Sequence, residues 1–147
     1  MDSRELMIER QLKARGISSE AVLAAMSKVP REEFVAPELQ EHAYEDRPLI
    51  FVFGAMRDKA IAEMAEILFP LAQRVIATVA ENPRSATPDE IREAAGRTSA
   101  EIIDTPDVIV ALEKARELAG PGDLVVITGS IYVVGEAMRE LGITPAN

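Results

Sequence analysis

The fold of this chain is decided where one sequence pattern gives way to another, at Ile50-Phe51-Val52-Phe53-Gly54-Ala55-Met56-Arg57-Asp58-Lys59. Four apolar residues followed by a glycine are typical of a buried strand of a parallel sheet that ends in a turn. Upstream, Ala43-Tyr44-Glu45-Asp46-Arg47-Pro48-Leu49 closes a charged segment with helical spacing. The chain therefore joins a helical segment, residues 1–49, to an α/β segment, residues 50–147, and we expect the two to form one folded unit.

Strand and helix patterns alternate along residues 50–147. Strands are expected at residues 50–53, 74–79, 101–103 and 124–128, and helices at 57–68, from Pro88 onward, at 106–118 and at 131–141. This alternation predicts a mainly parallel α/β sheet of four to five strands flanked by helices, with right-handed crossovers. The run Leu124–Thr128 is the most continuously apolar, and we expect it at the centre of the sheet.

Residues 1–49 follow helical spacing. One helix is predicted at residues 3–15, where Gly16 ends it, and a second is predicted between the cap residues Ser18/Ser19 and Pro30. Residues 31–48 indicate a short helical turn and a loop. The apolar faces of the two helices are expected to pack on the sheet through Leu6, Leu12, Val22, Leu23 and Met26.

The composition narrows the classes of function. Of 147 residues, 48% are apolar and 28% are charged, which suits one globular domain with an aliphatic core. The net charge is −9 with no cluster of Lys or Arg, so neither nucleic acid nor a membrane is expected as a partner. The lack of cysteine excludes disulfides and thiol chemistry, and a single histidine, His42, argues against a metal site. With no signal peptide and no membrane-spanning run, we expect a cytoplasmic protein.

The exits of three predicted strands carry the candidate chemistry, because ligands of parallel sheets bind beyond the carboxyl ends of the strands. These exits are Gly54–Arg57, Glu81–Arg84 and Thr128–Ser130. They give three anion-binding candidates, Gly54, Arg57 and Gly129. Each exit also has a structural explanation, since glycines form turns, serines cap helices and loop arginines are often only solvated. The sequence has no Gly-x-x-x-x-Gly-Lys-Ser/Thr and no Gly-x-Gly-x-x-Gly motif. The residues by themselves therefore predict a small anion site and no nucleotide-binding loop.

Three blocks of residues 50–147 resemble the C-terminal domain of folylpolyglutamate synthase/dihydrofolate synthase, in the Mur ligase superfamily. They are Val52–Lys59, Asn82-Pro83-Arg84 and Thr128–Ala137. The resemblance implies a Rossmann-like domain of an enzyme that joins glutamate to folate by ATP-dependent amide ligation through an acyl phosphate. It also implies that Asn82 and Arg84 meet the amino-acid substrate, and that Ser130 lies on the glutamate side.

The family's ATP-binding domain and the Asp-Ala-His-Asn-Pro segment that opens its C-terminal domain are missing from the sequence. Residues 1–49 resemble instead the amino-terminal end of protein-L-isoaspartate O-methyltransferase. The resemblance rests on Arg10-Gln11-Leu12 with Arg15-Gly16-Ile17, on Val29–Val35 and on Ala43–Leu49. The serine region and the glycine-rich cofactor loop that follow in that family are also missing. The chain therefore resembles a chimera, either a natural fusion or a recombinant, in which the helical segment replaces the lost opening strand and helix.

These observations favour a non-catalytic chimeric α/β domain with at most residual binding of glutamate or another anion. Two alternatives remain open. One is a ligase that works with a separate ATP-binding partner, and the other is an interaction module that forms homodimers through an uncovered sheet edge. We expect no catalytic residue, metal or cofactor in the isolated chain. The expected partners are a second copy of the chain and, weakly, glutamate or a nucleotide.

Overall fold

The computed structural model describes residues 2–144, with the backbone alone at Leu39. The chain divides into two compact units, Met1–Asp46 and Arg47–Asn147. We call them unit 1 and unit 2 and describe each by itself. The packing of the helical segment on the sheet stays a prediction.

Unit 1 is helical, as expected. α1 (Ser3–Met7) runs on through a π-helical turn, Ile8–Leu12, and a 3-10 turn, Lys13–Arg15. Gly16 ends this helical stretch with φ of 85°, a conformation that only glycine adopts without strain. α2 (Glu20–Lys28) begins at Ser19, whose hydroxyl oxygen accepts a hydrogen bond from the Val22 N–H. The 3-10 turns Arg31–Phe34 and Pro37–His42 complete unit 1.

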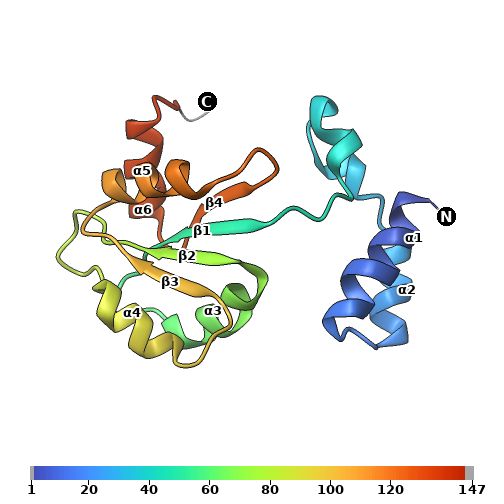
Figure 1. Ribbon diagram of the computed structural model, residues 1–147, viewed down its shortest axis with the longest axis horizontal. Helices are drawn as coiled ribbons and strands as arrows, with labels where there is room; N and C mark the ends of the chain where they lie inside the picture. The colour runs from blue at the N-terminus through green and yellow to red at the C-terminus, as the bar shows by residue number, and fades with distance from the viewer. Residues whose placement is uncertain (1, 145–147) are drawn as a thin grey trace. The chain divides into compact units, whose positions relative to one another are not determined.

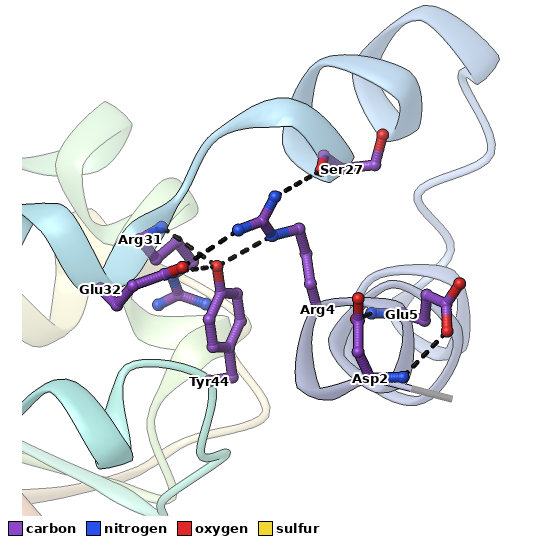
Figure 2. Close-up of polar contacts among 7 residues, drawn as sticks. All are labelled: Asp2, Arg4, Glu5, Ser27, Arg31, Glu32 and Tyr44. Atoms are coloured by element: carbon purple, nitrogen blue, oxygen red, sulfur yellow. Dashed lines mark hydrogen bonds and ion pairs between the residues drawn. The ribbon is translucent and has the colours of Figure 1, made fainter.

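A half-buried polar network centred on Tyr44 ties these pieces together (Figure 2). The Tyr44 hydroxyl accepts from Arg4 Nε at 3.0 Å and from the Arg31 backbone N–H at 3.1 Å, and it donates to the Glu32 carboxylate. Arg4 also bonds the other Glu32 oxygen at 3.1 Å and the Ser27 carbonyl at 3.2 Å. The guanidinium carbons of Arg4 and Arg31 each lie 5.8 Å from the centre of the tyrosine ring, within cation–π range. The hydrogen bond from Tyr44, supported by Arg4, holds the pKa of Glu32 below its ordinary value of 4.5.

We expect this network to make the stability of unit 1 depend on pH. Because the pKa of Glu32 is lowered in the folded state, its carboxylate stabilises unit 1 above pH 4.5, and this contribution is lost as the pH falls through the folded pKa. We expect Glu32→Gln to lower the urea midpoint of unit 1 at neutral pH and the difference from wild type to shrink in acid. The NMR signals of residues 20–28 report this midpoint. Glu38→Gln, at an exposed position of unit 1, is the matched control. An equal loss at both pH values, or none at neutral pH, would contradict the expectation.

Unit 2 is built on a parallel sheet of four strands in the order β3-β2-β1-β4 (Figure 1). The strands are β1 (Leu49–Phe53), β2 (Arg74–Ala77), β3 (Glu101–Asp104) and β4 (Leu124–Thr128). β1 lies between β2 and β4, with Phe51 opposite Val75 on one side and Val126 on the other. The predicted parallel α/β architecture is confirmed.

Helices cover both faces of the sheet, two on each (Figure 1). α3 (Ile61–Leu68) and α4 (Pro88–Ala95) lie on one face, and α5 (Val108–Leu118) and α6 (Ile131–Glu140) on the other. Side chains of β1 alternate between the two cores, because successive residues of a strand point to opposite faces. Phe51 and Phe53 pack toward α3 and α4, and the Phe53 ring meets Phe69 edge-on at 5.1 Å. Ile50 and Val52 pack toward α5.

The expectation that Leu124–Thr128 forms the central strand is wrong, since β4 lies at one margin of the sheet and pairs with β1 alone. Its apolar residues contact helices on both faces, and this produces the pattern of a central strand. With a neighbour on one side only, residues 125–128 remain half-buried and Leu124 is exposed. Within residues 2–144, no helix has the length and apolar character that crossing a membrane requires.

Candidate functional site

The exits of β1 and β4 lie side by side at the carboxyl edge of the sheet. From β1 the chain moves through α3 to β2 on one side, whereas β4, on the other side, is reached through α5 on the opposite face. The crevice between two such strands is where ligands bind in open α/β sheets. The topology therefore selects the β1–β4 exit as the candidate site.

Two glycines let these exits approach closely. Gly129, with φ of +100°, is so near β1 that a Cβ atom there would lie 2.4 Å from the Gly54 carbonyl oxygen. A Cβ atom on Gly54 would lie 2.7 Å from Val133 of α6 and 2.8 Å from the Thr78 carbonyl oxygen. Both positions thus require glycine, and the contact brings the first turn of α6 against the end of β1.

A cleft of about 290 Å³ lies beside this contact and is lined by Met56, Lys59, Arg84 and residues 129–132. We call it the β1–β4 cleft. Lys59 and Arg84 bring two cations, and Ser130 begins α6, whose first N–H groups carry partial positive charge. The Ser130 hydroxyl oxygen accepts from the Tyr132 N–H at 3.1 Å, so its own proton is directed elsewhere. The cleft is therefore suited to a small anion.

Arg84 forms an ion pair with Asp58 and is the more exposed of the two, with 61% of its side chain accessible against 51% for Asp58. Its Nη2 atom donates to Asp58 Oδ2 at 2.6 Å, which leaves other N–H groups of the guanidinium fork for a ligand. Asn82 acts on this residue through the backbone, because its side-chain oxygen accepts the Arg84 N–H at 2.9 Å. Asn82 therefore shapes the turn that presents Arg84 and does not line the cleft.

Arg57 belongs to a different arrangement. Its Nε atom lies 3.1 Å from each carboxylate oxygen of Glu90, and its Nη1 atom donates to the Pro83 carbonyl at 3.2 Å. Glu90 in turn accepts from the Thr87 N–H at the start of α4. That bond and the Arg57 pair hold the pKa of Glu90 below its ordinary value. Arg57 thus clamps the β1 exit to α4 and the intervening loop, outside the β1–β4 cleft.

The structure brings together three of the six candidate residues, since Arg84, Gly129 and Ser130 all line the cleft. Gly54 and Asn82 do not line the cleft but position the residues that do, and Arg57 lies outside the cleft. Sequence reasoning did not select Lys59, although its place between the first strand exit and the next helix was a signal that could have found it. Within the part of the chain that the structure describes, no three His, Cys, Asp or Glu side chains gather closely enough to hold a metal ion.

The family model for the Mur ligase, glutamate ligase domain matches residues 18–131. The chain belongs to the Mur ligase family. A probable bifunctional folylpolyglutamate synthase/dihydropteroate synthase of Haloferax volcanii is 36% identical over 104 residues, covering 70% of this chain and 12% of that protein. The structure of Mycobacterium tuberculosis folylpolyglutamate synthase complexed with ADP and AMPPCP matches with a TM-score of 0.64 and 24% identity. That match covers 74% of this chain and 27% of the other, and it shows the shared fold.

The chain is also similar to a second family. A protein-L-isoaspartate O-methyltransferase of Methanoculleus marisnigri is 35% identical over 147 residues, covering 92% of this chain and 59% of that protein. We expected this similarity in residues 1–49, but the match extends beyond them. Both resemblances stated from the sequence are confirmed, and together they are consistent with a fusion or chimera. The chain thus spans 59% of this methyltransferase, 12% of the Haloferax protein and 27% of the Mycobacterium enzyme.

The contact between Gly54 and Gly129 predicts a large effect of a single methyl group. We expect Gly129→Ala to lower the free energy of unfolding by at least about 2 kcal/mol, because it combines a positive φ with a backbone clash. Gly135→Ala is the matched control, since a Cβ atom there meets nothing within 4 Å. On a helix it should stabilise by about 0.5–1 kcal/mol. Urea denaturation followed by circular dichroism measures both, and equal effects of the two substitutions would refute the role of the contact.

Proposed function

We propose that this Mur ligase domain, as an isolated chain, is non-catalytic and holds a small acidic amino acid, with glutamate as the first candidate, in the β1–β4 cleft. The observation that carries the proposal is the convergence of Lys59, Arg84 and the N-terminus of α6 on one cleft. Carboxylates are the natural partners of an arginine fork and of free helix N–H groups. The names of the family and of the Haloferax relative, a glutamate ligase domain and a folylpolyglutamate synthase, support the same substrate class.

The cleft also offers a feature that a simple anion would not use. Asp58 does not line the cleft, but it pairs with Arg84 at 2.6 Å and so supplies a carboxylate beside one of the two cations. An α-amino acid carries an ammonium group that this carboxylate can accept, while Arg84, Lys59 and the helix terminus take its carboxylates. We therefore expect L-glutamate to bind better than glutarate, which has both carboxylates and no ammonium group.

Binding is expected to be weak. The cleft is small and open, and the ligand has to share Arg84 with Asp58. A dissociation constant near 1 mM corresponds to only about 4 kcal/mol, which a few exposed charge-assisted contacts supply. The non-catalytic part of the proposal rests on the sequence, which has no phosphate-binding loop of the kind that ATP-dependent ligation needs.

Isothermal titration calorimetry of the whole chain tests the binding site. We expect L-glutamate to bind with a dissociation constant on the order of 1 mM. Arg84→Gln should weaken binding roughly tenfold, because a charge-assisted bond contributes about 1.5–3 kcal/mol when formed well. Arg97→Gln, at an exposed arginine that does not line the cleft, is the matched control and should bind as wild type does. Equal affinities of the two variants would place any glutamate elsewhere and reject the site.

The ligase alternative is supported by membership of the family, and a coupled assay separates it from the proposal. The chain is mixed with ATP, glutamate and a folate, with and without a separately supplied Mur-type ATP-binding domain. We expect no phosphate release by the chain alone. Release that needs both components and is lost in Arg84→Gln would favour the two-component ligase over a non-catalytic domain.

A further inference from the structure

The two margins of the sheet differ in how their backbone is protected. At β3, the exposed residues Glu101 and Asp104 carry charges, which discourage another strand from pairing there. Arg92 binds Asp104 at 2.5 Å and also donates to the Ile102 carbonyl at 3.2 Å. Arg74 pairs with Glu101 at 3.0 Å. The charges, and the Arg92 side chain that bonds the Ile102 carbonyl, therefore protect this margin from pairing with another strand.

Among the described residues of unit 2, the margin at β4 shows none of these devices. Its residues, Leu124-Val125-Val126-Ile127-Thr128, include no charge, proline or glycine, and Figure 1 shows β4 as the outermost strand on its side of the sheet. Exposed apolar surface surrounds it, with Leu124 46% and Ile131 82% accessible. Within the described part of unit 2, no strand pairs with the outer side of β4, and a neutral edge strand of this kind is a template for another strand.

The hydrogen bonds to β1 identify which backbone groups of β4 face outward. The Leu124 N–H bonds the Pro48 carbonyl at 2.9 Å, and the Thr128 carbonyl accepts from the Gly54 N–H at 3.4 Å. In a parallel ladder, alternate residues direct both backbone groups to the same neighbour. Leu124, Val126 and Thr128 therefore face β1.

The intervening residues Val125 and Ile127 direct their N–H and C=O groups to the open margin. These positions are symmetric about Val126, so an antiparallel copy of the same strand can satisfy them. With a two-fold axis at Val126, Val125 forms a hydrogen-bonded pair with Ile127 of the second copy, and Ile127 does so with Val125 of the second copy. Val126 then meets Val126 of the second copy as the close, non-hydrogen-bonded pair.

We propose that β4 pairs antiparallel with β4 of a second copy of this chain, so that the two sheets become one. Charge selects the antiparallel direction, because it places Asp123 beside Gly129 of the second copy. A parallel pair would place two Asp123 carboxylates together at the end of an otherwise neutral strand. The pairing covers exposed Leu124 with Thr128 of the second copy and joins β-branched residues at the centre.

The mass of the full chain over a range of concentrations, combined with amide hydrogen exchange, tests the proposal. Sedimentation should show a change from 16.0 kDa to twice that mass as the concentration rises. In the dimer, the Val125 and Ile127 amides should be as protected as those of Leu124 and Val126, whereas in dilute solution they should exchange faster. A chain that remains monomeric at the highest concentration would overturn the proposal, whether or not these amides are protected. A dimer in which Val125 and Ile127 exchange fast would overturn it as well.

Two substitutions at the edge sharpen the test. Ile127→Pro removes an outward N–H while keeping the ladder to β1, and it should abolish the dimer. Leu124→Lys, at an exposed position, should weaken the dimer roughly tenfold. The two-fold axis repeats the contact between Leu124 and Thr128 of the second copy, so one substitution removes it twice. Ile109→Lys on α5 is the matched control, with 51% of the isoleucine exposed and no place at the edge. Equal dimerisation of Leu124→Lys and wild type, with the amide spectrum showing an intact fold, would contradict the proposed interface.

Discussion

The contact between Gly54 and Gly129 is the constraint on which the architecture of unit 2 depends. It joins the ends of two parallel strands at a separation that excludes a side chain on Gly129, while Val133 and the Thr78 carbonyl exclude one on Gly54. Because Ser130, the residue after Gly129, caps the start of α6, the same contact sets where the helix N-terminus lies. Ser130, Lys59 and Arg84 share a cleft as a consequence. A backbone approach of this kind positions a site more firmly than flexible loops alone would.

The two units are stabilised in different ways. Unit 2 buries most of the apolar core, on both faces of its sheet. Among the described residues of unit 1, the buried apolar side chains are those of Met7 and Ala43. The polar network around Tyr44 accordingly supplies much of the connection between its helical pieces, and α2 presents Val22 to solvent with 46% of the residue accessible. This difference agrees with an origin of the two segments in different protein families.

Local signals were sufficient for most elements. Ser19 was expected as a helix cap, and it accepts a backbone N–H at the start of α2, as Thr87 and Ser130 do for α4 and α6. The strand runs were also predictable, because apolar residues bounded by turn residues are a local pattern. The place of Leu124–Thr128 in the sheet was not predictable, because it depends on whether another strand lies beside it. Burial by helices on two faces produces the same sequence pattern at the margin as at the centre.

The candidate site shows the same division between local and distant information. Position at the strand ends singled out Arg84, Gly129 and Ser130 as candidates, and the structure places all three around one cleft. Arg57 has the same local setting, but its carboxylate partner Glu90 is 33 residues away along the chain, which no local pattern reveals. Lys59 joins the cleft because the turn after β1 returns toward the start of α6, which is a matter of three-dimensional geometry.

Two-dimensional amide NMR of the whole chain during titration with L-glutamate tests the central claim most directly. The account predicts shifts that cluster at Lys59, Arg84 and residues 129–132, with the signals of unit 1 unchanged. A well-dispersed spectrum that does not move, or shifts that cluster on residues 8–27, would contradict the assignment of the β1–β4 cleft as the ligand site.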